Sequence, residues 1–105
     1  MADAEPYVVE ILDHDRVTEV NDNVDVFVYL PDGRKYVATF FTLSNIKTIM
    51  EHHRASGESA GGKYFWAADM VIVERLDRVT IETAVADLMK SGDFEKAFDG
   101  PHRFD

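Results

Sequence analysis

The chain of 105 residues contains no cysteine. This absence excludes disulfides, thiolate metal sites and cysteine nucleophiles, and it fits a reducing compartment. No apolar run approaches the roughly 18 residues that a membrane span requires. The first residues are acidic and lack the basic and apolar regions of a secretory signal. We therefore expect a cytoplasmic protein that makes no use of a membrane.

Basic residues are scarce in the first third of the chain. Residues 1–32 hold nine acidic side chains and one basic one, Arg16, whereas residues 33–105 hold eleven acidic and ten basic ones. Because an acidic surface repels phosphate backbones, we expect no direct binding of nucleic acid. A basic protein is an electrostatically suitable partner. The candidate partner-binding residues are Glu10, Asp13, Asp15, Glu19, Asp22 and Asp25.

That charge has a simpler explanation, which is that a net charge of −9 keeps the protein in solution.

Apolar residues make up 46% of the chain and charged residues 30%, proportions typical of a globular fold. The length corresponds to one domain spanning residues 1–105. We expect residues 1–5 and 100–105 to be frayed.

A β-hairpin over residues 24–42 is the best-defined element of the sequence. Apolar and polar residues alternate from Val24 to Leu30, and Lys35 to Thr42 form the returning strand. The turn between them is Pro31-Asp32-Gly33-Arg34, in which glycine accepts a positive φ. Further strands are expected at residues 7–12, 64–66 and 70–74.

Two helices are predicted from apolar residues that recur every three or four positions. The first follows a cap at Thr42 or Ser44 and ends at Gly57, and one of its faces is lined by Leu43, Ile46, Ile49, Met50 and His53. Residues 56–63, which hold three glycines and two serines, are expected to form a loop. The second follows a cap at Asp77 or Thr80 and ends at Gly92. A short helical turn then places Phe94 and Phe98 on one side.

The order of these elements is strand, hairpin, helix, short strands, helix. It lacks the regular alternation of a parallel α/β fold. We therefore predict an α+β fold, a mainly antiparallel sheet with two helices packed on one face. The other face is either exposed or meets a partner.

No catalytic, cofactor-binding or metal-binding residue is predicted. The histidines, His14, His52, His53 and His102, have no metal-ligand spacing. Gly57 and Gly62-Lys63 match the spacing of a phosphate loop, but the motif requires serine or threonine where Tyr64 stands. The serines show no nucleophile signature. The protein is therefore not expected to be an enzyme.

The aromatic run Tyr64-Phe65-Trp66 is the most distinctive local feature. Alternation places Tyr64 and Trp66 on one face and Phe65 on the other. Large aromatic residues are common both in cores and at interfaces. We expect a core role, with Trp66 substantially buried; the alternative is a contact surface for a partner or a small ligand.

Three stretches together resemble a group of small uncharacterised bacterial proteins. They are TFFTLSNIKTIM, SGESAGGKYFWAADMVIVERL and IETAVADLMKSGDFEKAF, and the resemblance covers roughly residues 38–98. It implies no activity, cofactor or site residue. The acidic first third lies largely outside it.

Two hypotheses of function follow. The first is a non-enzymatic interaction module that binds a basic protein through its acidic surface, in the manner of an immunity or inhibitor protein. The alternative is a small-molecule-binding protein or enzyme with an aromatic-lined site near residues 56–66. The sequence does not indicate an oligomeric state.

Overall fold

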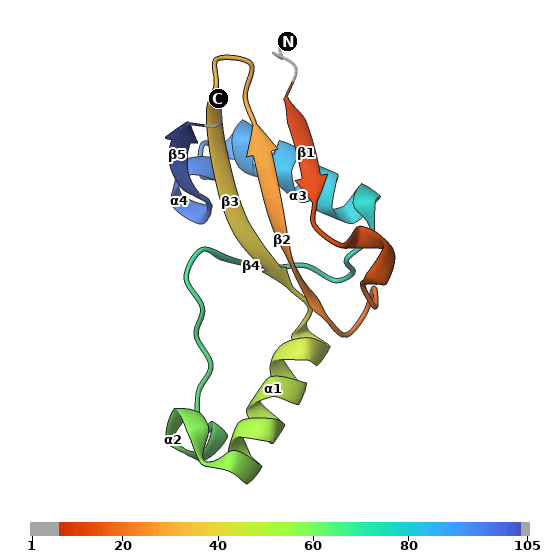
Figure 1. Ribbon diagram of the computed structural model, residues 1–105, viewed down its shortest axis with the longest axis vertical. Coiled ribbons are helices and arrows are strands. Elements are labelled where there is room, and N and C mark those ends of the chain that lie inside the picture. Colours follow the sequence, from red (N-terminus) through yellow and green to blue (C-terminus); the bar gives the residue numbers. More distant parts are fainter. Residues whose placement is uncertain (1–6, 104–105) are drawn as a thin grey trace.

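The computed structural model describes residues 7–103 and shows a five-stranded sheet with helices behind it (Figure 1). The strands are β1 (Val8–Ile11), β2 (Asn23–Tyr29), β3 (Arg34–Phe41), β4 (Met70–Ile72) and β5 (Asp99–Arg103). The strands β1, β2 and β3 are antiparallel neighbours. On its other edge, β3 pairs with β4 in parallel and with β5 in antiparallel fashion. The predicted α+β class and the mainly antiparallel sheet are confirmed.

The predicted hairpin is present as β2 and β3. Leu30 N–H donates to the Arg34 carbonyl at 2.8 Å, and Gly33 N–H donates to the Leu30 carbonyl at 3.1 Å. Gly33 has a φ of 94°, the conformation for which glycine is suited. The Asp32 carboxylate accepts the Arg34 N–H and fixes the turn.

The core lies on one face of this sheet. Alternate residues of the hairpin are buried there, and they include Val26, Tyr36 and Phe40. Helix α3 (Arg78–Ser91) and the short α4 (Phe94–Ala97) cover this face (Figure 1). They contribute the buried residues Ile81, Val85 and Phe94, and Phe98 is buried directly after α4. The rings of Phe94 and Phe98 stack with centroids 4.5 Å apart, which confirms the predicted pairing.

The long helices α1 (Leu43–Ser56) and α3 begin and end where the sequence predicts. Thr42 Oγ1 accepts the Asn45 N–H, and the Asp77 carboxylate accepts the Thr80 N–H. Gly57 and Gly92 end the helices in the left-handed conformation.

Helix α1 does not join the helical layer, although the sequence suggested two helices on one face. It projects beyond the end of the sheet (Figure 1), and none of its 14 residues is buried. The core face is already covered by α3 and α4, so no apolar surface remains there for α1. Polar bonds hold its base instead: Asn21 donates to Thr48 at 3.3 Å and Asn23 donates to Asn45 at 2.8 Å.

The segment after α1 was predicted to be a loop, and it forms a left-handed turn, α2 (Glu58–Gly62). Ser59, Ala60, Gly61 and Gly62 all have positive φ values. Gly62 approaches α1 so closely that a β-carbon there would lie 2.3 Å from the Met50 carbonyl oxygen. Residues 63–69 then return to β4. We call α1, α2 and this return segment, residues 43–69, the arm.

Two predicted local structures are wrong. Residues 64–66 form no strand, because they run through the return segment without pairing with any strand of the sheet. Residues 100–103 are not frayed, since β5 includes them and pairs with the part of β3 that β4 leaves uncovered. Residues 1–5 and 104–105 lie outside the described residues. Within residues 7–103, no helix is long and apolar enough to cross a bilayer.

Candidate functional site

The connection between β1 and β2, residues 12–22, carries much of the acidic charge and is called the acidic loop below. It contains one turn of 3₁₀ helix, η1 (His14–Arg16). Its far end is fastened to the segment before α3. Glu19 forms an ion pair with Arg75, and the Leu76 N–H donates to the Glu19 carbonyl at 2.8 Å. The hydrogen bond that the Arg75 guanidinium donates to the Glu19 carboxylate raises the pKa of Arg75. The Glu19 carboxylate is therefore engaged within the chain.

Asp22 closes the acidic loop from within. Its carboxylate accepts the N–H groups of Thr18 and Asn23 at 3.1 and 2.8 Å. Its own N–H donates to Thr42 Oγ1, the atom that also caps α1. Asp22 thus fixes the loop and connects it to the base of the arm.

Asp13 and Asp15 lie at the near end of the loop, and both are exposed. Asp13 has a φ of 54°, a conformation that aspartate adopts more readily than most residues. Within residues 7–103, no side-chain hydrogen bond or ion pair engages either carboxylate. These two are the carboxylates of the loop that remain open to a partner.

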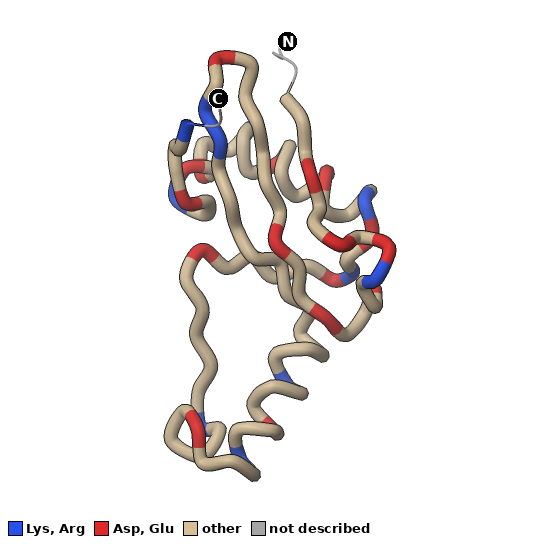
Figure 2. Tube along the Cα trace, viewed as in Figure 1, with Lys and Arg blue, Asp and Glu red and all other residues tan. Residues whose placement is uncertain are grey.

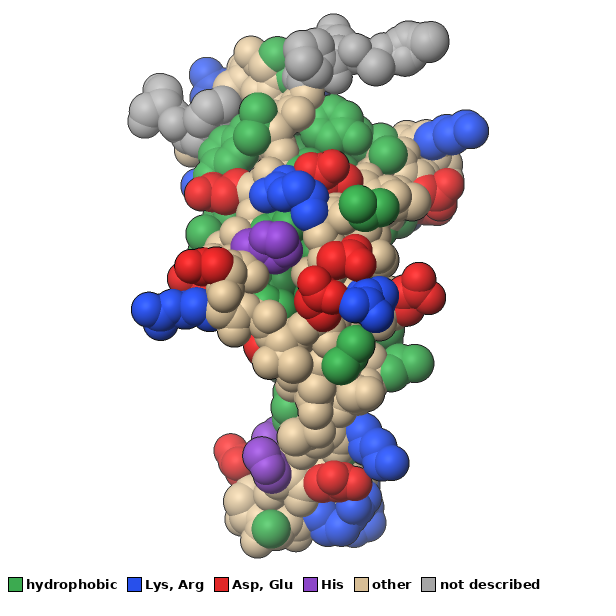
Figure 3. Space-filling view, turned by 90° about the vertical axis from the view of Figure 1, so that its right-hand side faces the viewer, with side chains coloured by type: hydrophobic (Ala, Val, Ile, Leu, Met, Phe, Trp, Pro, Cys, Tyr) green, Lys and Arg blue, Asp and Glu red, His purple; other side chains and the backbone are tan. Residues whose placement is uncertain are grey.

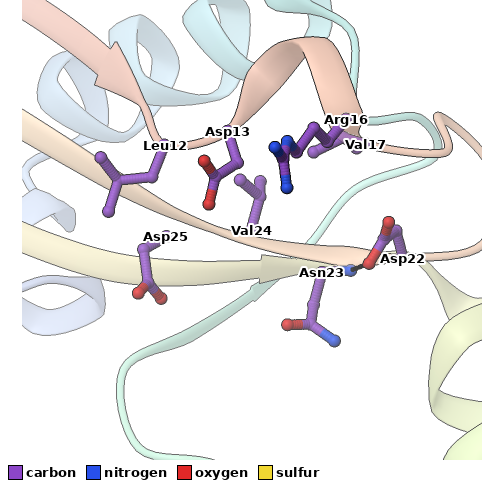
Figure 4. Close-up of a pocket in the computed structure, with 8 residues that line it drawn as sticks. All are labelled: Leu12, Asp13, Arg16, Val17, Asp22, Asn23, Val24 and Asp25. Carbon is purple, nitrogen blue, oxygen red and sulfur yellow. Dashed lines mark hydrogen bonds between the residues drawn. The ribbon is translucent and has the colours of Figure 1, made fainter.

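A surface cavity of about 310 Å³ lies between the acidic loop and β2. Figure 4 shows Asp13 and Arg16 from the loop on one side and Asn23 and Asp25 from β2 on the other. Its lining residues are Leu12, Asp13, Arg16, Val17, Asp22, Asn23, Val24 and Asp25. Three carboxylates and one guanidinium give it a net negative charge. Such a site suits a lysine or arginine side chain.

Glu10 and Asp25 face another surface, although Asp25 also lines the edge of the cavity. Both point to the sheet face that α3 and α4 leave uncovered, because they alternate with the buried residues of β1 and β2. Glu10 accepts the Tyr29 hydroxyl at 2.7 Å, and this bond raises the pKa of Tyr29. Asp25 accepts the Thr39 hydroxyl at 2.9 Å.

The six predicted carboxylates are thus divided among three settings. Asp13 and Asp15 are free on the loop, Asp22 and Glu19 serve the loop's own structure, and Glu10 and Asp25 face the open side of the sheet. Figure 2 shows the acidic residues along this part of the chain. Figure 3 shows basic side chains interspersed among acidic ones on one flank of the body. The acidic surface is therefore divided among these settings rather than continuous.

The histidines are dispersed within residues 7–103. His53 lies 3.8 Å from Glu58, and His102 lies 2.8 Å from Asp99. No group of three or more metal-ligating side chains forms among the described residues.

The aromatic run has a different position from the one expected. Trp66 is 71% exposed and Tyr64 is 51% exposed, so the expectation of a buried Trp66 is wrong. Phe65 alone turns inward, where its ring meets that of Phe41 edge to face at 5.2 Å. Three surface cavities of the described chain are lined by other segments than residues 56–66.

Sequence reasoning assigned no function to the apolar side chains of the uncovered sheet face. The cross-strand register places Val8 beside Tyr29, Phe27 beside Val37, and Thr39 beside Met70. The alternation of Asp25, Phe27 and Tyr29 in β2 was the available signal. This alternation shows that the strand has a second face, but it does not show whether another layer of the fold covers that face.

Comparison with known proteins identified no matching family, no matching curated protein and no matching solved structure.

Proposed function

We propose that this protein is a non-enzymatic interaction module that binds a basic segment of a partner protein at the acidic loop. The supporting observation is the pair of exposed carboxylates, Asp13 and Asp15, beside a negatively lined cavity of about 310 Å³. The loop that carries them is held by Glu19–Arg75 and by Asp22. A partner would therefore meet charges that are already positioned, which lowers the entropic cost of binding.

Electrostatics gives this site a defined kind of partner. A lysine or arginine side chain that enters the cavity meets Asp13 and Asp25 on opposite sides. The affinity comes from a small number of charge-assisted hydrogen bonds. The association rate comes from the longer-range field, which salt screens beyond about 8 Å at physiological ionic strength. An immunity- or inhibitor-like role, with a basic toxin as partner, is the specific form of this proposal.

The test is affinity capture from extracts of the native organism, with Asp13→Asn/Asp15→Asn as the altered bait. Asp22 is left unchanged because it has a structural role. The control bait, Glu82→Gln/Asp87→Asn, removes the same charge from α3. We expect a basic protein on the wild-type and control baits at low salt and a strong loss from the loop variant. That protein should also be released by high salt.

Purified components then separate the proposal from non-specific attraction. The captured protein should bind the wild-type chain with an association rate that falls as salt rises. The loop variant should associate at least tenfold more slowly at low salt. Equal binding by all three proteins at every salt concentration would remove the electrostatic proposal and leave the charge a role in solubility.

A further inference from the structure

The uncovered face of the sheet carries a band of apolar side chains, which we call the open face. Alternation and cross-strand register place its residues on one side of four adjacent strands. Val8 is 62% exposed on β1, and Ile72 is 47% exposed on β4. The apolar members are Val8, Leu12, Phe27, Tyr29, Val37, Met70 and Ile72. Within residues 7–103, helices cover only the opposite face of the sheet, so Val8 and Ile72 on this face meet water.

The arm is the second surface that lacks a covering layer. A helix of 14 residues is only marginally stable in water without tertiary packing. Leu43 is 69% exposed at its base, and Tyr64 and Trp66 are exposed on the return segment. Helical spacing places Lys47 and Arg54 close to Leu43 around the axis of α1. One side of the arm therefore presents an apolar residue at its base, followed by two cations toward its tip.

We propose that two copies of this chain form a symmetric dimer, in which the arm of each copy lies along the open face of the other. This interface goes beyond the site of the proposed function: the two surfaces share Leu12 and Asp25, but the dimer uses neither Asp13 nor Asp15. Three observations select a second copy as the occupant: the lengths of the two surfaces, their charges, and the area that they bury together.

The lengths of arm and open face match. Helix α1 extends for about 21 Å, and the seven residues of β2 extend for about 23 Å. The molecule measures 48 × 27 × 23 Å, so the arm accounts for a large part of the longest dimension. A twofold rotation that places one arm on the partner's sheet places the partner's arm on the first sheet. This reciprocity is the property of an isologous interface.

The charges also correspond. Lys47 and Arg54 lie about 10 Å apart along α1. Glu10 and Asp25 lie on neighbouring strands of the open face, about 8 Å apart by the strand spacing and rise. The cations of one arm therefore oppose carboxylates of the partner's sheet. Each carboxylate already accepts a hydroxyl, from Tyr29 or Thr39, which holds it in place.

A dimer interface of sufficient area requires both arm-to-sheet contacts. The strands β1 to β4 hold 4, 7, 8 and 3 residues, which at the usual strand rise and spacing present a face of roughly 330 Å². One arm on one face removes about that area from each surface, or roughly 650 Å² in total, which is below the 1,000 Å² of a stable interface. Two reciprocal contacts bury about 1,300 Å² and exceed that value. The symmetric arrangement is therefore favoured over a single contact.

The first experiment measures mass by sedimentation velocity from micromolar to millimolar concentration. We expect a species of twice the chain mass of 11.9 kDa. Leu43→Asp in the arm and Val8→Asp in the open face should each weaken the dimer at least tenfold. Val79→Asp on α3 is the matched control, because Val79 is 75% exposed outside both surfaces, and it should leave the dimer intact. Circular dichroism verifies that each variant is folded.

A charge exchange tests the pairing itself. Lys47→Glu/Arg54→Glu should weaken the dimer, and adding Glu10→Lys/Asp25→Lys to the same chain should restore it. All four side chains lie at the surface, so the variants are expected to fold. A lack of rescue would overturn the proposed pairing.

A distance measurement tests the arrangement. Because the chain has no cysteine, Ala55→Cys places a single spin label near the tip of the arm. Reciprocal arms place the two labels about 45 Å apart, given the dimensions of the molecule and a helix of about 21 Å. Labels within about 20 Å would indicate contact between the arm tips, and labels beyond about 60 Å would indicate free arms. Either result, or a monomer at every concentration, would overturn the proposal.

Discussion

The ring of Phe65 meets the ring of Phe41 edge to face, with centroids 5.2 Å apart and planes at 73°. Phe41 is the last residue of β3, and Phe65 lies in the return segment of the arm. This contact joins the return segment to the sheet where α1 leaves it. It also gives the aromatic run its structural role, since its two neighbours, Tyr64 and Trp66, point into water.

Phe65→Ala should therefore destabilise the protein. Removal of a half-buried phenylalanine that has one aromatic partner should lower the free energy of unfolding by about 2 kcal/mol. The control Val79→Ala, on the exposed side of α3, should change it by less than about 0.5 kcal/mol. Urea denaturation measures both values. Equal effects of the two substitutions would show that the Phe41–Phe65 contact contributes little.

Gly62 and Gly61 form a matched pair in the left-handed turn. Both have positive φ, so alanine at either position should cost about 1 kcal/mol through the backbone. A β-carbon on Gly62 would also lie 2.3 Å from the Met50 carbonyl oxygen, whereas one on Gly61 would meet nothing within 4 Å. Gly62→Ala should therefore lower the free energy of unfolding by at least about 1 kcal/mol more than Gly61→Ala. Similar values for the two variants would contradict the close packing of α2 on α1.

Gly33 tests the hairpin turn without any packing effect. Its φ is 94°, and a β-carbon there would meet no atom within 4 Å. Gly33→Ala should cost about 1 kcal/mol because alanine tolerates this conformation poorly. Thermal or urea unfolding measures the change. An unchanged midpoint would mean that the turn adopts another conformation.

Asp77 gives α3 a pH-dependent contribution to stability. The Thr80 hydroxyl and backbone N–H hold the pKa of Asp77 below its usual value, and Arg75 acts in the same direction. A lowered folded-state pKa stabilises the protein above the unfolded value of about 3.9, and this stabilisation is lost as the pH falls through the folded value. The difference in Tm between the wild type and Asp77→Asn should therefore shrink below about pH 4. A difference that stays constant from pH 7 to pH 3 would rule out this linkage.

Local features of the sequence determined most of the elements. The Pro31–Arg34 turn and the alternation beside it predicted the hairpin, because turn chemistry and strand period depend on neighbouring residues. Thr42, Asp77, Gly57 and Gly92 marked the helix ends, because caps satisfy backbone groups within one turn. The spacing of Phe94 and Phe98 predicted their contact for the same reason.

The candidate site depended on contacts that spacing cannot reveal. Glu19 and Asp15 are similar carboxylates in the sequence, but Arg75, 56 positions beyond Glu19, pairs with Glu19 and not with Asp15. Asp22 is distinguished by the neighbouring N–H groups of Thr18 and Asn23, which its carboxylate accepts in the folded loop. Which acidic residues remain free therefore depends on the conformation of the loop as well as on the distant pairing with Arg75.

The sequence by itself determined the α+β composition, the hairpin, the helix boundaries and the uneven charge, because each depends on residues a few positions apart. Only the tertiary structure decided that α1 leaves the core, that Trp66 faces water and that β5 joins the sheet. An apolar stripe in the sequence indicates that a helix or strand has apolar surface to bury. It does not indicate which other element of the fold covers that surface. Here α3 and α4 cover the core face of the sheet. The polar bonds from Asn21 and Asn23 hold the base of α1 at the end of the sheet instead.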